Sequence, residues 1–300
     1  MEYTMSMNNT FLRGVNLGGW LLLEKWMTPS LFAGTEAIDE YTFMQTPGAA
    51  KKIDEHRKAF IAESDFKWLA EHGVNAVRIP VGYWVLEGDA PYVEATTYLD
   101  WAMSMAEQYR LEVIIDVHGL PGSQNGRDHS GRVGKALWYR SVDDRRRSVD
   151  VVVAIAERYK ESSAFWGIQA VNEPRLGLLQ WRLRRYYRAV YRALGGVLPP
   201  ETKVVVSDTF TPRLMSGALR PTTQPVVLDV HLYHMSTLFA KYLSADWFLR
   251  KTKRRQKMLE RLSRTQPIII GEWSGVMSWE TMRHVPKQQR DELFARYVAL

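Results

Sequence analysis

Short runs of apolar and β-branched residues, seven in all, alternate with amphipathic segments along the 300-residue chain, and this alternation predicts an α/β fold. The length suits a single (β/α)8 barrel (TIM barrel) without a second domain. The two longest loops, residues 21–54 and 119–139, both begin where a predicted strand ends. Functional loops gather at that edge of a barrel, so the loop lengths also favour a barrel.

Each predicted strand is an apolar run bounded by polar residues: residues 11–17, 76–81, 112–117, 167–171, 203–207, 226–231 and 267–271. Apolar residues recur at helical spacing between them, in residues 63–72, 94–109, 142–159, 178–194, 245–263 and 287–299. A complete barrel has eight strands, yet Leu300 lies within the helix after the seventh. We therefore expect one catalytic barrel over residues 1–300 whose closing eighth strand is absent, truncated at the C-terminal end or supplied in another way.

Composition excludes several classes of protein. The chain has no cysteine, so it carries no disulfide, thiolate metal site or cysteine nucleophile. The basic residues behind its net charge of +7 cluster on segments of helical spacing, which indicates solvated helix faces, and no RNA-binding signature accompanies them. Residues 1–10 lack the pattern of an export signal, and no apolar stretch is long enough to span a membrane. We expect a soluble cytoplasmic protein with no nucleic-acid or membrane partner, and action outside the cell stays open as the alternative.

Two glutamates stand directly after apolar strands. Glu173 follows a buried run and precedes a helix-breaking proline within residues 171–174. Glu272 ends another apolar run beside Gly271, which permits close approach of the backbone. Glycoside hydrolysis needs one carboxyl that protonates the leaving oxygen and a second that attacks or activates water. A single strand-end glutamate is often a structural ion-pair member, but two of them predict a glycosidase.

Polar residues interrupt or end three other strands. Arg78 lies inside an apolar strand, so its buried cation needs an anionic partner, and a catalytic glutamate is the natural candidate. His118 and His231 end their strands, and Tyr233 follows His231 closely. A lone histidine is more often a satisfied core residue, whereas two at strand ends indicate a polar pocket. A zinc site is the alternative, but the chain contains no His-x-His or His-Glu-x-x-His segment, so no metal is expected.

With these residues in place, the chain resembles glycoside hydrolase family 5 of clan A, and within it the exo-β-1,3-glucanases. The resemblance rests on residues 12–21, LRGVNLGGWL, together with Glu24 and residues 27–32, MTPSLF. A second block, residues 118–126, reads HGLPGSQNG. The similarity extends from about Phe11 to the C-terminus, and these blocks are far more specific than Asn-Glu-Pro alone.

The resemblance implies a retaining β-glycosidase in which Glu173 is the general acid/base and Glu272 the nucleophile. Their carboxyls are then expected about 5 to 5.5 Å apart. Arg78 is implied to form an ion pair that keeps Glu272 charged. The residues implied to contact or frame the sugar are Glu24, Arg78, His118, Asn172, His231, Tyr233 and Trp273.

The implied substrate is an oligo- or polysaccharide with β-glucosidic bonds, cleaved without a cofactor as an exo-β-1,3-glucanase or β-glucosidase would cleave it. Two alternatives stay open at this point. One is a family 5 hydrolase that acts on another β-glycan or on a glycolipid. The other is a carbohydrate-binding barrel whose site is inactive.

Overall fold

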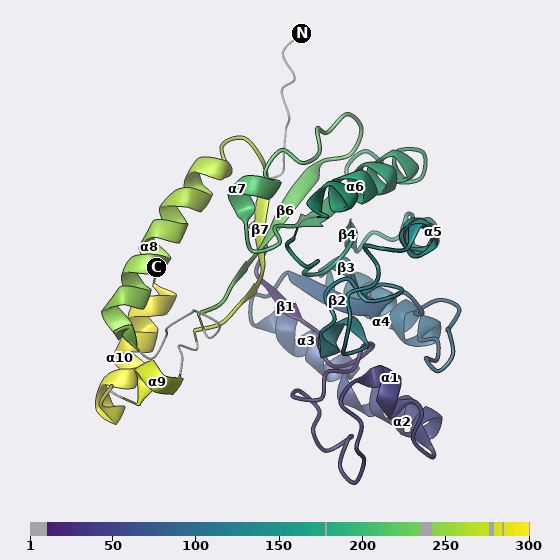
Figure 1. The fold of residues 1–300 in the computed structure, drawn as a ribbon, viewed down its shortest axis with the longest axis horizontal. Helices are drawn as coiled ribbons and strands as arrows, with labels where there is room; N and C mark the ends of the chain where they lie inside the picture. The colour runs from purple at the N-terminus through teal and green to yellow at the C-terminus, as the bar shows by residue number, and fades with distance from the viewer. Residues whose placement is uncertain (1–10, 178, 235–241, 276–278, 284, 300) are drawn as a thin grey trace. The chain divides into compact units, whose positions relative to one another are not determined.

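The structure, a computed structural model, describes residues 11–177, 179–234, 242–275, 279–283 and 285–299. The chain divides into two compact units, Met1–Ile168 and Gln169–Leu300. Strands and helices alternate along both units (Figure 1). None of the helices in these ranges combines the length and the apolar character needed to cross a bilayer.

The seven predicted strands are confirmed, with small differences at their ends: β1 (Gly14–Asn16), β2 (Ala76–Gly82), β3 (Glu112–Gly119), β4 (Phe165–Gln169), β5 (Lys203–Ser207), β6 (Val226–Leu232) and β7 (Ile268–Trp273). In the first unit β1 to β3 are hydrogen-bonded in chain order, and in the second unit β5 to β7 are. The pairs β1·β2, β2·β3, β5·β6 and β6·β7 are parallel, as the alternation with helices requires. Within the ranges described, no strand follows β7.

The six predicted helices are also confirmed: α3 (Glu63–Glu71), α4 (Thr96–Tyr109), α5 (Val142–Tyr159), α6 (Gln180–Leu194), α8 (Ala245–Leu262) and α10 (Lys287–Val298). The predicted start of α6, Leu178, lies outside the described residues. Short helices that the apolar pattern did not predict are α1 (Glu40–Phe43), η1 (Asp128–Ser130), α7 (Pro212–Met215) and α9 (Trp279–Met282). Each spans a single turn or less, so none offers a periodic apolar face.

The sequence predicts a loop over residues 21–54, and this prediction is wrong where α2 (Ala49–Phe60) begins. The buried face of α2 runs from Ile53 to Arg57, a cation where an apolar residue is expected. Arg57 is 2% exposed and lies 3.6 Å from the carboxylate of Glu40. Its guanidinium also donates hydrogen bonds to two backbone carbonyls. A buried, paired arginine therefore completes the helix face and conceals its periodicity in the sequence.

In the first unit, β2 is buried along its whole length, and β3 is buried from its second residue onward. Helices α3 and α4 lie side by side (Figure 1), and α4 also packs against β3. Burial of both strand faces explains their near-continuous apolar runs. The polar exceptions on these strands, Arg78, Asp116 and His118, are therefore held rigidly by a packed core.

In the second unit, β5 and β6 are buried over almost all of their residues, whereas β7 is partly exposed. Helices α8 and α10 lie side by side (Figure 1). Their shared core consists of Phe248, Leu249, Leu293 and Tyr297. The strands β5 to β7 form a parallel ladder whose carboxyl ends carry polar side chains.

Candidate active site

The chain leaves the sheet sharply after β4, and this turn positions Glu173. Asn172 is fully buried, and Glu173 adopts a left-handed φ of 39°. Such a conformation costs a non-glycine residue about 1 to 3 kcal/mol and is found mainly where function demands it. Pro174 follows and has no amide hydrogen with which to continue a ladder. The carboxylate of Glu173 is consequently turned out of the strand, with 12% of its side chain exposed.

The ladder between β6 and β7 positions Glu272. Glu272 is the direct partner of His231, after a register shift between Asp229 and His231. The side chain of Glu272 is 16% exposed. Both glutamates are thus mostly shielded from water but still accessible to a ligand.

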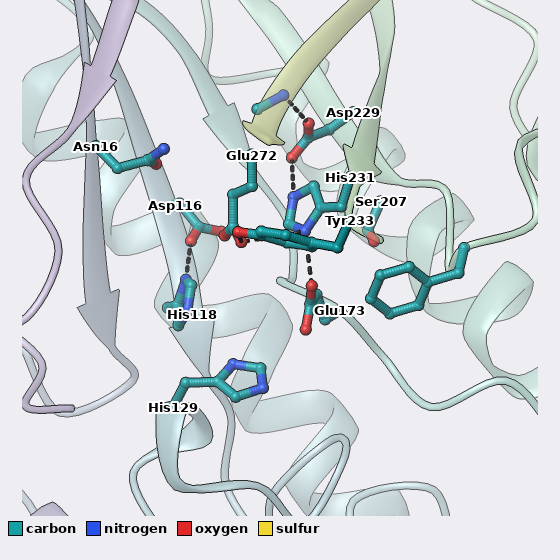
Figure 2. Close-up of polar contacts among 12 residues, drawn as sticks. Asn16, Asp116, His118, His129, Glu173, Ser207, Asp229, His231, Tyr233 and Glu272 are labelled. Carbon is teal, nitrogen blue, oxygen red and sulfur yellow. Dashed lines mark hydrogen bonds and ion pairs between the residues drawn. The ribbon is translucent and has the colours of Figure 1, made fainter. Parts of the chain in front are cut away.

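His231 lies between the two glutamates, as Figure 2 shows. Its Nδ1 is 2.8 Å from Oε1 of Glu173 and 3.4 Å from Oε2 of Glu272. An oxygen of each glutamate and a nitrogen of His231 all lie within 4.8 Å of one another. Retaining glycosidases hold their carboxyls about 5 to 5.5 Å apart, and inverting ones about 6.5 to 9.5 Å. One oxygen of each glutamate thus lies within 4.8 Å of the other, which is compatible with the shorter spacing, and the predicted carboxyl separation stays a prediction.

Tyr233 supports Glu272. Its hydroxyl donates a hydrogen bond to Oε2 at 2.8 Å, the same oxygen that faces His231. Hydrogen bonds donated to a carboxylate favour its charged form, which is the form that a nucleophile needs.

The charge of His231 follows from its neighbours. Burial alone would lower the pKa of its imidazole, but the attraction of Asp229 and Glu272 outweighs it. Hydrogen bonds to Asp229 and Glu173 add to this attraction, and the pKa of His231 is raised well above its usual value. These neighbouring carboxylates therefore favour the protonated form of the ring.

Glu173, His231 and Glu272 are close enough together to hold a metal ion. A doubly protonated imidazole, however, has no lone pair to offer a metal. Both ring nitrogens of His231 face carboxylates instead, Nδ1 toward Glu173 and Nε2 toward Asp229. These contacts favour a site that works without a metal, which stays a prediction.

The loop after β5 contributes groups that the sequence analysis did not single out. Asp208 is 2% exposed, and burial raises the pKa of its carboxyl to about 7, although the Phe210 amide and the charge of His231 oppose the rise. Thr209 and Phe210 both have left-handed φ values, 51° and 58°. The ring of Phe210 is 54% exposed, and its centroid lies 6.3 Å from that of His231. An apolar strand that ends in Ser-Asp-Thr-Phe was the available signal, because it repeats the pattern seen before Glu173.

In the first unit, Arg78 contacts Asp116 and Asn16. Its NH2 lies 2.9 Å from Oδ2 of Asp116, and its NH1 donates to Oδ1 of Asn16 at 2.9 Å. A buried carboxylate thus partners the cation, as its burial requires. The predicted ion pair with Glu272, which belongs to the second unit, stays a prediction.

His118 is the other strand-end residue of the first unit. Figure 2 shows its Nδ1 directed at Oδ2 of Asp116, and the ring of His129 lies 5.4 Å from that of His118. Glu24 accepts a hydrogen bond from the indole of Trp26 at 2.9 Å. These contacts place polar groups together but leave their sugar-binding roles as predictions.

The predicted site residues divide between the units. Six belong to the second unit: Asn172, Glu173, His231, Tyr233, Glu272 and Trp273. Of these, the structure brings Glu173, His231, Tyr233 and Glu272 into contact. Trp273 ends β7 and is 53% exposed. Glu24, Arg78 and His118 belong to the first unit.

Two aspartates were missed by the sequence analysis. Asp116 and Asp229 are fully buried, and each contacts the histidine two positions later in its strand. The signal was the tripeptide Asp-Val-His, which occurs in both β3 and β6. Residues two apart in a strand project to the same face, so the pairing could have been predicted.

Comparison with known proteins assigns a family and a fold. Residues 39–299 match the family model described as Cellulase (glycosyl hydrolase family 5). The chain is 39% identical over 281 residues to a probable glucan 1,3-beta-glucosidase A of Aspergillus fumigatus. The aligned region covers 90% of this chain and 66% of that protein. It is 38% identical over 287 residues to the Aspergillus clavatus protein of the same name, with coverage of 92% and 68%. The chain thus spans about two thirds of the length of these relatives, and slightly less for the first.

Solved structures share the fold at lower identity. The rutinosidase from Aspergillus niger superposes with a TM-score of 0.77 at 23% identity, over 90% of this chain and 81% of that one. An endoglucanase from Thermotoga maritima reaches a TM-score of 0.57 at 15% identity, over 88% and 79%. These likenesses confirm the predicted α/β barrel class.

Proposed function

The chain belongs to glycosyl hydrolase family 5, and from this premise we propose that it is a retaining β-glycosidase acting on β-glucosidic bonds, in the manner of an exo-β-1,3-glucanase or β-glucosidase. The observation that carries the proposal is the approach of Glu173 and Glu272 within 4.8 Å around His231. The relatives named glucan 1,3-beta-glucosidase support an oligo- or polysaccharide of glucose as the substrate. No cofactor takes part.

In the first step, Glu272 attacks the anomeric carbon while Glu173 donates its proton to the glycosidic oxygen. The bond from the anomeric carbon to that oxygen breaks, the leaving sugar departs as an alcohol, and an ester between the glucosyl unit and Glu272 forms. Tyr233 and His231 hold Oε2 of the nucleophile during the attack. His231, 2.8 Å from Glu173, also stabilises the carboxylate that remains after proton donation.

In the second step, Glu173 removes a proton from a water molecule, whose oxygen attacks the anomeric carbon and displaces Glu272. Two successive inversions at one carbon give net retention. The strained backbone at Glu173 supports this double use, because it holds one carboxyl where it reaches both the leaving group and the water.

The test distinguishes the roles of Glu173 and Glu272 by comparing how the activity of each variant depends on the leaving group of the substrate. Glu173→Gln should lose about 10²- to 10⁴-fold in kcat/KM on laminarin-type oligosaccharides, which need protonation of the leaving group. On an aryl β-glucoside with a good leaving group it should still form the glucosyl ester, seen as a burst of the aryl product. Glu272→Gln should lose turnover of both substrates.

Glu260→Gln, an exposed change on α8, is the matched control and should leave kcat/KM unchanged. Cellulose-type oligosaccharides form a third substrate arm that resolves the linkage. Equal losses on both substrates for Glu173→Gln, or a product of inverted configuration by proton NMR, would contradict the proposed roles.

A further inference from the structure

Asp229 is a fully buried carboxylate of β6 that contacts two parts of the candidate site. Its Oδ1 accepts a hydrogen bond from the backbone amide of Gly271 at 2.7 Å. Its Oδ2 lies 3.1 Å from Nε2 of His231 (Figure 2). Gly271 immediately precedes Glu272, so one side chain contacts both the backbone next to the nucleophile and the histidine between the two glutamates.

The contact with Gly271 depends on the absence of a side chain there. A Cβ at position 271 would lie 2.2 Å from Oδ1 and 2.6 Å from Oδ2 of Asp229, far inside van der Waals contact. Glycine inside a strand normally weakens it, and a close approach of another group is one reason for its presence. Gly271 and Asp229 therefore form a matched pair across the β6–β7 ladder.

The contact with His231 favours the charged form of the ring. Burial favours a neutral imidazole, and among the groups that raise the pKa of His231, Asp229 contributes the largest attraction. The acidic groups that face His231 come from four elements: Asp229 on β6 itself, Glu173 after β4, Asp208 after β5 and Glu272 on β7. Asp229 is the one that contacts Nε2, on the side of the ring opposite to the glutamates.

From these contacts we propose that Asp229 is a positioning residue, which keeps His231 protonated between Glu173 and Glu272 and ties the β7 backbone at Gly271. The proposal rests on the proposed roles of the two glutamates. With Asp229 ionised, His231 presents a charged N–H to Glu272 and, after proton donation, to Glu173. The hydrogen bond to Gly271 holds the backbone next to Glu272 against β6. The reaction itself does not pass through Asp229.

A comparison with the aspartate–histidine pair on β3 shows how Asp229 differs. Asp116 also contacts the histidine two residues later, His118, but its second partner is the Arg78 guanidinium. At Asp229, the second partner is a backbone amide beside Glu272. The same tripeptide thus orients a histidine in both strands, and only the second also fixes the backbone of a catalytic candidate.

The experiment is an NMR titration of His231 in the full chain, observed through the ring nitrogens. In the unaltered protein, His231 should be doubly protonated at neutral pH. In Asp229→Asn, the amide oxygen can still accept from Gly271 but the charge is lost, so the apparent pKa of His231 should fall by about 1 to 3 units. The alkaline limb of the kcat/KM profile should move to lower pH by a similar amount, with activity retained at low pH. Asp229→Ala, which removes both contacts, should lose activity at every pH.

Asp208→Asn is the matched control, because Asp208 is also buried and faces His231 without a hydrogen bond to it. It should move the titration of His231 much less. An equal shift in both variants, or a neutral His231 at neutral pH in the unaltered protein, would overturn the proposal, and the second result needs no variant to fold. If the titration behaves as expected while Glu173→Gln and Glu272→Gln keep full activity, the proposed function fails and the role of Asp229 toward His231 stands.

Discussion

Oε2 of Glu272 accepts a hydrogen bond from the hydroxyl of Tyr233 at 2.8 Å and lies 3.4 Å from Nδ1 of His231. A hydrogen bond to a charged group contributes about 1.5 to 3 kcal/mol, which is large for one hydroxyl. Tyr233→Phe removes this donor while keeping the ring. It should lower kcat/KM roughly 10- to 100-fold, measured with an aryl β-glucoside.

Tyr109→Phe provides the control for Tyr233→Phe. Tyr109 donates to Oε1 of Glu63 at the same 2.8 Å, but on an exposed surface of the first unit. Loss of that bond should leave kcat/KM unchanged. If both variants lose activity equally, or neither does, the hydroxyl of Tyr233 has no specific role in the site.

At the level of elements, β6 and β7 approach each other closely where the Gly271 amide donates to Asp229. A methyl group at position 271 would overlap the carboxylate, so Gly271→Ala must displace β7 or rotate Asp229. Overpacking of this kind costs about 1 to 3 kcal/mol. We expect a lower free energy of unfolding by urea and a loss of activity larger than the loss of folded protein explains.

Gly196→Ala is the comparison at the level of elements, since an added Cβ there has nothing within 4 Å and the backbone is not left-handed. It should be neutral or slightly stabilising, because it restricts the unfolded chain. A Gly271→Ala protein as stable and as active as Gly196→Ala would show that β7 can shift away from Asp229 without consequence.

In the whole molecule, two buried carboxyls make stability depend on pH, one in each unit. Burial raises the pKa of Glu40 to about 7 despite the attraction of Arg57, and it raises the pKa of Asp208 to about 7. The folded state therefore binds these protons more tightly than the unfolded state, whose carboxyls titrate near pH 4. The stability that they contribute is complete below about pH 4 and is lost as the pH rises to about 7.

Glu40→Gln and Asp208→Asn test this dependence, because neither replacement titrates. Relative to each variant, the unaltered protein should lose roughly 3 to 4 kcal/mol of unfolding free energy between about pH 4 and pH 8. Urea unfolding across that range measures the difference. Curves that stay parallel for the variants and the unaltered protein would show that both carboxyls are already ionised at acidic pH.

The local sequence pattern was sufficient to predict the seven strands, six of the helices and the positions of the two glutamates at strand ends. Strand and helix periodicities are properties of neighbouring residues, and a carboxylate that directly follows an apolar run is visible in the sequence. Helix α2 was not predicted because Arg57 lies on its buried face, and the carboxylate that pairs with Arg57, Glu40, is distant in the chain. Asp208 could have been found from its place directly after an apolar strand, whereas the left-handed backbone of Thr209 and Phe210 has no sequence signature.

By itself the sequence determined the fold class and placed Glu173 and Glu272 directly after apolar strands, since alternation and strand-end position follow from short segments. Their roles as acid/base and nucleophile stay a proposal. The tertiary structure alone decided the spacing of Glu173 and Glu272, the insertion of His231 between them and the contact of Asp229 with Gly271. The physical reason is that these quantities depend on the register between parallel strands and on burial. Both arise only when segments far apart in the chain are packed together.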